Sequence, residues 1–278
     1  MLNSGMLDPG EGPIRSDLYL PSTLDHLLWG RLSSRADSPV LSIDAGSEVT
    51  IDTISHEGIL EDQGRDPKSF FGSHGVDEVL SDAIALAASE YPRAMGADGP
   101  HVVTGPIEIR SAHPGDVLAM TVVEALPRVP YGVVSNRHGK GALPQEYPHG
   151  ADVFSVFASL DEIDPTRARM SFGPGDTRTA SFPIAPFLGI MGVAVDATSV
   201  RIRCRPAPTE ATSTSTCSPR GRRSTSPSRS GEPSPTSATR TSRKATVRSH
   251  SPPSKRPSAR RSGSTSSPAK KHWKRSAH

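Results

Sequence analysis

The chain changes character near Ser199, and this break limits what its two parts can fold into. Residues 199–278 contain no Leu, Met, Phe or Tyr, and their large apolar residues are only Val200, Ile202, Val247 and Trp273. Residues 1–198 carry 13 Lys and Arg against 27 Asp and Glu, whereas the remainder carries 19 against 2. A segment with so little apolar surface cannot offset the entropy of ordering its backbone. We therefore expect an acidic folded part and a disordered basic tail.

The composition of the tail leaves three interpretations open. The tail could be a disordered segment without a function of its own. It could be a basic arm that neutralises nucleic-acid phosphates with clusters such as residues 220–223 and 270–275. It could also be the product of a shifted reading frame. The third interpretation arises because Ser, Arg, Pro and Thr are the residues that GC-rich coding DNA gives when it is read out of phase.

The shifted frame can be tested on the residues themselves. Codons are chosen for each residue and regrouped so that each new codon starts at an old third base. Residues 199–218 can then be read as GADSVPPGAYGGNIDINLL. Residues 221–249, completed by the first two bases of codon 250, can be read as QAVYLPVQVGGALAYVGDPHFSQGDGEVA. Both readings lie in one phase and show the apolar–polar alternation and Gly-rich turns of strands. We therefore favour a frameshift and expect little regular packing in the tail as written.

The first 198 residues suffice for one large domain or two small ones. No run of 18 apolar residues predicts a membrane span, and no basic region followed by an apolar core predicts a secretory signal. Both cysteines, Cys204 and Cys217, lie in the tail, so the folded part is expected to lack disulfides, thiolate metal sites and cysteine nucleophiles. We expect a cytoplasmic location.

The hydrophobic pattern of the folded part predicts a mainly β fold, a β-rich α+β domain with sandwich- or barrel-like sheets and one clear helix. The helix is expected over residues 77–91. Strands are expected as a hairpin of residues 40–44 and 48–54, as a pair of residues 106–110 and 117–126 around a type II turn, and at residues 154–160, 167–172 and 179–183. Long loops are expected at residues 57–75 and 131–150, and a buried strand or tight apolar loop at residues 184–195.

Three short segments, in this order, resemble the acetamidase/formamidase family: Thr104 to Ile107, Ala112 to Leu118, and Pro183 to Ala194. The match runs from about Pro39 to Asp196. The regrouped readings PPGAYGGNIDINLL and VGDPHFSQGDGEVA resemble the family's glycine-rich GGN segment and its GDxHxxxGDGE segment. The resemblance implies hydrolysis of small aliphatic amides, such as formamide and acetamide, to carboxylate and ammonia.

This resemblance divides the chain into an N-terminal extension (residues 1–38), an incomplete acetamidase/formamidase-like domain (residues 39–198) and the basic tail (residues 199–278). It implies a small amide as substrate and a homo-oligomer when the chain is intact. No membrane partner is expected, and a nucleic-acid partner is disfavoured. A missing last third would leave open sheet edges and exposed apolar faces, so we expect this chain to be poorly soluble or inactive. The alternative is a non-enzymatic β domain whose basic tail binds nucleic acid in a salt-sensitive way.

Amide hydrolysis needs an activated water or nucleophile, stabilisation of the oxyanion and an acid for the leaving amine. Asp52 and His56 lie four residues apart at the exit of a strand, with Glu57 adjacent. They are candidates for a metal-free base or for a divalent metal site holding zinc or calcium. Alternatively, they are simply polar groups at a strand end.

Glu108 is the third candidate catalytic residue, although its alternation with Ile107 and Ile109 is also typical of a side chain that faces solvent. The candidates for substrate binding are His101, Thr104 and Gly105.

Overall fold

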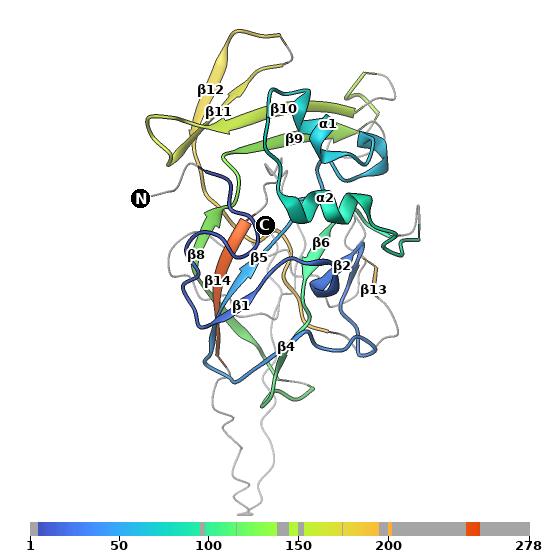
Figure 1. Cartoon of the computed structure of the whole chain (residues 1–278), viewed down its shortest axis with the longest axis vertical. Helices are drawn as coiled ribbons and strands as arrows, with labels where there is room; N and C mark the ends of the chain where they lie inside the picture. Colours follow the sequence, from blue (N-terminus) through green and yellow to red (C-terminus); the bar gives the residue numbers. More distant parts are fainter. Residues whose placement is uncertain are drawn as a thin grey trace, which may run out of the picture.

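The computed structural model describes residues 5–94, 98–114, 116–137, 145–149, 153–173, 175–194, 200–201 and 243–250. Over these residues the chain is mainly β, which confirms the predicted fold class (Figure 1). The tail outside residues 200–201 and 243–250, where disorder was predicted, lies outside the described residues. No helix of the described part is long and apolar enough to cross a membrane.

Two four-stranded sheets hold most of the strands. The first has the order β1 (Leu18–Leu20), β5 (Glu48–Asp52), β14 (Arg243–His250) and β8 (Ala119–Pro127). The second has the order β12 (Thr179–Pro183), β11 (Arg167–Ser171), β10 (Val153–Leu160) and β9 (Tyr131–Arg137). Three two-stranded ladders join β2 (Leu27–Trp29) to β6 (Val102–Thr104), β4 (Leu41–Ile43) to β7 (Ile107–Ile109), and β13 (Val200–Arg201) to β3 (Arg31–Leu32).

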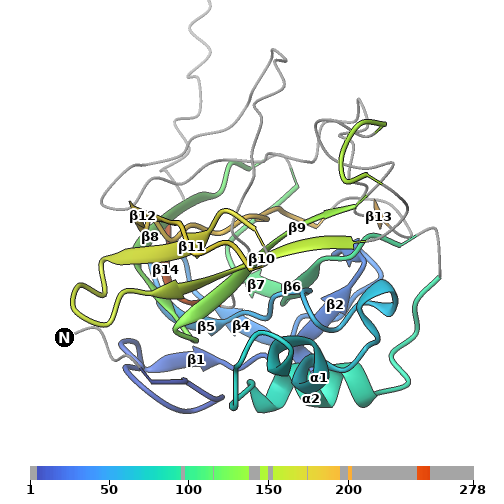
Figure 2. The same ribbon diagram turned by 90° about the horizontal axis from the view of Figure 1, so that it is seen from above.

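The helical elements are short, and α1 and α2 lie together at the lower edge of the view in Figure 2. They are η1 (Leu24–His26), η2 (Glu61–Gln63), α1 (Pro67–Gly72) and α2 (Ser81–Ala88). The predicted helix over residues 77–91 is thus confirmed only in its middle, because Ser89 already has an extended backbone. The predicted loop of residues 57–75 is wrong for η2 and α1. The Asp66 carboxylate caps α1 by accepting the backbone N–H groups of Lys68 and Ser69.

The strands predicted at residues 154–160, 167–172 and 179–183 are confirmed as β10, β11 and β12. They form an antiparallel meander together with β9. The prediction of a loop over residues 131–150 is wrong for residues 131–137. The β-branched pair Val133 and Val134 suits a strand, and seven residues of β9 pair in register with β10.

The predicted hairpin is wrong in its pairing, and the two strands predicted around a type II turn do not pair with each other. A turn between β4 and β5 does form, with the Ser47 N–H donating to the Asp44 carbonyl oxygen at 3.1 Å. However, β4 pairs in parallel with β7, and β5 pairs in parallel with β1. Likewise, β7 and β8 belong to different sheets. Each of these strands pairs with a strand more distant in sequence instead of with its neighbour. Local alternation of polar and apolar residues does not determine which strands pair.

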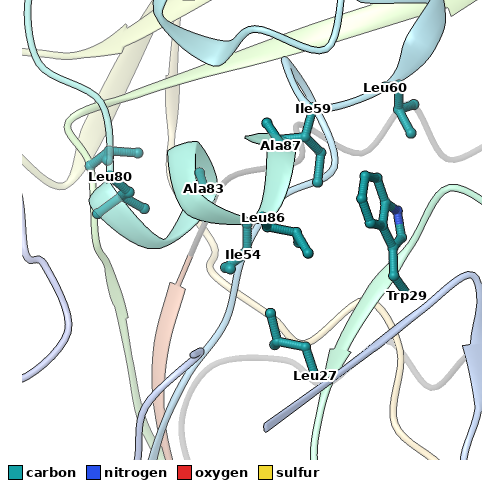
Figure 3. Close-up of a cluster of buried hydrophobic side chains, with 10 residues drawn as sticks. Leu27, Trp29, Ile54, Ile59, Leu60, Leu80, Ala83, Leu86 and Ala87 are labelled. Atoms are coloured by element: carbon teal, nitrogen blue, oxygen red, sulfur yellow. The ribbon is translucent and has the colours of Figure 1, made fainter. Parts of the chain in front are cut away.

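The main hydrophobic core lies between α2, the loop that follows β5, and β2 (Figure 3). Its buried members are Leu27, Trp29, Ile54, Ile59, Leu60, Leu80, Ala83, Leu86, Ala87 and Val129. Trp29 is 1% exposed, and the Arg93 guanidinium lies 4.2 Å from its ring centroid. The segment expected to be an N-terminal extension therefore contributes to the core.

The apolar segment of residues 184–194 contains no strand in the described part, and Val193 is 56% exposed. It is an apolar loop that is only partly buried.

Two short parts of the tail do form strands, contrary to the expectation of little regular packing. β13 pairs with β3, and β14 pairs on both sides, with β5 and with β8. Residues 244–248, Lys-Ala-Thr-Val-Arg, alternate polar and apolar residues, which is the pattern of a strand.

Candidate functional site

Asp52 ends β5, and its side chain is completely buried. The Tyr19 hydroxyl on β1 donates a hydrogen bond to Asp52 Oδ2. Burial, followed by this hydrogen bond, raises the pKa of the Tyr19 phenol, so the phenol remains a donor. The Thr104 hydroxyl on β6 donates to the Asp52 carbonyl oxygen at 2.7 Å. These contacts fix the end of β5 from two sides.

His56 and Glu57 follow in the loop after β5, and both side chains are buried. His56 Nε2 lies 3.4 Å from Glu57 Oε1. The His101 ring, just before β6, meets the His56 ring edge-on, with 4.9 Å between the ring centroids. A carboxylate beside an imidazole fixes the orientation of the ring and stabilises its protonated form during a proton transfer. The pair therefore has the geometry of a base and its orienting group.

Glu57 is held by side chains from two further elements. Gln63 Nε2, at the end of η2, donates to Glu57 Oε2 at 2.5 Å, and the Ser135 hydroxyl on β9 donates to the same oxygen at 2.8 Å. Arg137 Nη1, at the end of β9, lies 3.8 Å from Glu57 Oε1. The sequence-distant strand β9 thus completes the surroundings of the His56–Glu57 pair.

The pKa of the Glu57 carboxyl reflects two opposed effects. Burial alone raises this pKa, because it disfavours the charged form. The hydrogen bonds from His56 and Gln63, together with the charges of His56 and Arg137, outweigh burial and lower the pKa to about 2. Glu57 is therefore a carboxylate at neutral pH and acts as a fixed negative charge rather than as a proton donor.

The loop that carries His56 and Glu57 is shaped by a glycine and anchored by a buried ion pair. Gly58 has φ +84, and an added Cβ would lie 3.0 Å from the Phe71 ring, so glycine is required at this turn. Arg128, completely buried, donates from Nη1 to the Thr53 carbonyl oxygen at 3.1 Å and to Asp82 Oδ2 at 2.7 Å. The start of the loop is thereby tied to α2.

The structure brings together four of the six predicted site residues: Asp52, His56, His101 and Thr104. Gly105 is adjacent to Thr104 in sequence, has φ +132 and donates its N–H to the His26 carbonyl oxygen at 2.9 Å, so it shapes the backbone. Glu108 instead lies on β7, exposed, and accepts a hydrogen bond from the Ser42 hydroxyl on β4.

The described residues do not provide a full set of ligands for the predicted metal site. Within the part of the chain that the structure describes, no three His, Cys, Asp or Glu side chains are arranged to hold a metal ion. The Asp52 carboxylate accepts from Tyr19, and His56 lies against Glu57. The zinc or calcium site therefore stays a prediction, and the chemistry below is assigned to side chains alone.

Sequence reasoning missed Gln63, Ser135 and Arg137 and left Glu57 as a neighbour of His56. Ser135 and Arg137 were missed because residues 131–150 read as a loop. A signal was present, since Tyr131, Val133, Ser135 and Arg137 share one face of β9. That face changes from apolar to polar along the strand, which is typical of a strand that leaves the core and enters a site.

No family model matches the chain. A curated relative from Schizosaccharomyces pombe, named "Putative formamidase", is 34% identical over 89 residues, which make up 29% of this chain and 22% of the relative. The chain thus matches about a fifth of the length of that protein.

Solved structures resemble the chain more broadly. A recombinant protein from Thermoanaerobacter tengcongensis, described as a predicted acetamidase/formamidase, aligns over 84% of this chain and 68% of its own, with a TM-score of 0.50 and 16% identity. An acetamidase from Yersinia enterocolitica covers 86% of this chain and 68% of its own, with 18% identity and a TM-score of 0.46. At such identity the first of these similarities shows a shared fold.

Proposed function

Because the chain resembles acetamidase/formamidase proteins in sequence and in fold, we propose that it descends from an enzyme that hydrolyses the C–N bond of small linear amides, with formamide and acetamide as the substrates to test. The observation that carries this proposal is the buried His56–Glu57 pair, with its Nε2–Oε1 distance of 3.4 Å and the His101 ring against it. This pair can do what amide hydrolysis requires, which is to take a proton from water and to return it to a leaving amine.

The roles follow from the contacts. His56 moves the proton, because it is the titratable ring closest to an orienting carboxylate. Glu57 positions His56 and balances the positive charge that develops on its ring. Gln63 and Ser135 hold Glu57 in place and are positioning residues. The uncharged products, a carboxylic acid and ammonia, exchange a proton in solution to give carboxylate and ammonium.

The proposal includes the reading frame. The tail from residue 199 is the product of a frameshift, and the site in this chain is therefore incomplete. We call the polypeptide with one base restored ahead of codon 199 the frame-restored chain.

Release of ammonia from formamide and acetamide, measured on this chain and on the frame-restored chain, tests both parts. We expect activity in the frame-restored chain and little or none in the chain as written. Equal activity in both would refute the loss of the last third, and no ammonia from an ordered frame-restored chain would refute the small-amide assignment.

A further inference from the structure

Ser155 is a polar residue in an otherwise apolar part of β10. Residues 153–158 read Val-Phe-Ser-Val-Phe-Ala, and the neighbours of Ser155 on the same face of the strand, Val153 and Phe157, are both apolar. The Ser155 residue is half-buried. A hydroxyl group among apolar side chains needs a hydrogen-bond partner to offset the loss of water. The partner of this hydroxyl group therefore indicates why a serine stands here.

That partner is Ser135, which lies directly opposite Ser155 in the antiparallel ladder of β9 and β10 (Figure 1). The two hydroxyl oxygens are 2.8 Å apart, which is a hydrogen-bond distance. Ser135 is also hydrogen-bonded to Glu57 Oε2, again at 2.8 Å. A continuous series of hydrogen bonds therefore runs from Ser155 through Ser135 to the buried carboxylate of Glu57.

The direction of both hydrogen bonds follows from the chemistry of the groups. A serine hydroxyl carries one proton, so Ser135 can donate to Glu57 or to Ser155 but not to both. Glu57 is a carboxylate at neutral pH, and its Oε2 also accepts from Gln63 Nε2, so Glu57 can only accept. Ser135 therefore donates to Glu57, and Ser155 donates to Ser135.

This direction gives Ser155 an influence on Glu57. A hydroxyl group that accepts one hydrogen bond becomes a stronger donor in the next, because each bond polarises its neighbour. In addition, the Ser155 proton already lies between the two oxygens, so the Ser135 proton cannot turn toward Ser155. The other oxygen of the same carboxylate, Oε1, lies 3.4 Å from His56 Nε2. A change at Ser155 is thus transmitted to the carboxylate that orients His56.

We propose that Ser155 is a positioning residue of the candidate site, which acts through Ser135 to hold Glu57 in the orientation that His56 requires. The proposal deepens the proposed function and rests on it, since the orientation of His56 matters for amide hydrolysis. β10 thereby joins β9 as an element that builds the site.

A double-mutant cycle tests this coupling without reference to activity. Urea unfolding is measured for the full chain as written, for Ser155→Ala, for Glu57→Gln and for the double variant. Glu57→Gln removes the charge that strengthens the hydrogen bond from Ser135, so Ser155 then has less to reinforce. Ser155→Ala should therefore raise the unfolding equilibrium constant by a smaller factor in Glu57→Gln than in the parent. We expect the two factors to differ by at least ~3-fold.

The control for the cycle is Ser159→Ala. Ser159 lies on the same strand and the same face as Ser155, but opposite Tyr131. Its effect should be the same in the parent and in Glu57→Gln. The coupling of Ser155 to Glu57 should also vanish in a Ser135→Ala background, which lacks the intermediate hydroxyl. Additive effects of Ser155→Ala and Glu57→Gln would overturn the proposal, and so would a coupling that persists without the Ser135 hydroxyl.

Kinetics separates positioning from a purely structural role. The measurements are made on whichever chain releases ammonia, the chain as written or the frame-restored chain. Ser155→Ala should lower kcat by about 5–10-fold and leave KM unchanged, because no contact with bound substrate is lost. Ser155→Thr keeps a hydroxyl group and suits a strand, so it should restore most of the activity. An unchanged kcat in Ser155→Ala, or an equal loss in Ser155→Thr, would overturn the positioning role.

The failure of this proposal and the failure of the proposed function can be told apart. Coupling between Ser155 and Glu57 in a chain that releases no ammonia would support the action of Ser155 on Glu57 and reject the amidase assignment. Ammonia release without that coupling would keep the amidase assignment and reject the role of Ser155.

Discussion

Replacing Glu57 with glutamine should make stability depend less on pH. The side chain is 3% exposed, and its carboxyl pKa is lowered from 4.5 to about 2 by His56, Gln63 and Arg137. One pKa unit between the folded and the unfolded chain corresponds to about 1.4 kcal/mol. The ionised carboxylate therefore contributes about 3 kcal/mol to the free energy of unfolding at neutral pH.

The direction of the pH dependence follows from the lowered pKa. The contribution is fully present above the unfolded pKa near 4.5 and is lost as the pH falls toward the folded pKa of about 2. Urea unfolding of the frame-restored chain and its Glu57→Gln variant should thus differ by about 3 kcal/mol at pH 7. At pH 3 the difference should be much smaller.

A matched control is Glu61→Gln. Glu61 pairs with Arg93 at 2.6 Å, but its side chain is 36% exposed, so the loss should stay below about 1 kcal/mol. A difference between the parent and Glu57→Gln that is the same at pH 7 and pH 3 would refute the account of Glu57 as a buried, charge-stabilised carboxylate.

Three further variants test the site and its supports. In the frame-restored chain, His56→Ala should lower the rate of ammonia release by at least ~100-fold, while Glu108→Gln should leave the rate unchanged, because His56 is buried against Glu57 and Glu108 is exposed. Similar losses from both would contradict the assignment. Asp82→Asn should cost about 3–5 kcal/mol in urea unfolding, since it leaves the Arg128 guanidinium buried without its carboxylate, and the double variant Asp82→Leu with Arg128→Met should recover most of that loss. Trp29→Ala should cost about 3–5 kcal/mol by calorimetry or urea unfolding, because it empties the centre of the main core.

The existence of most strands could be predicted from the sequence, but their partners could not. Alternation places the strand of residues 179–183 at its exact bounds, because a half-buried strand needs only local period-two patterning. The pairing of β4 with β7 joins residues more than 60 positions apart. That choice depends on which faces the whole chain can bury at once, and no local window contains this information.

The candidate site shows the same division. Asp52 and His56 can be recognised in the sequence because they are polar residues at the end of a strand, and both side chains are buried in the structure. Ser135 and Arg137 lie beside Glu57 only because β9 pairs with β10. Glu57 is important to the candidate site because its carboxylate is buried against His56. Tertiary packing decides whether a carboxylate is buried, so the local sequence does not predict it.

The strand that joins β5 to β8 also sets the order in which this protein can be completed on the ribosome. Everything else in the first sheet is synthesised by residue 127, yet its two halves must wait until position 250 has left the exit tunnel. During that interval the facing edges of β5 and β8 remain unpaired and open to chaperones or to neighbouring chains. An error in the reading frame after codon 198 therefore acts on a nascent chain that is already committed to most of its fold.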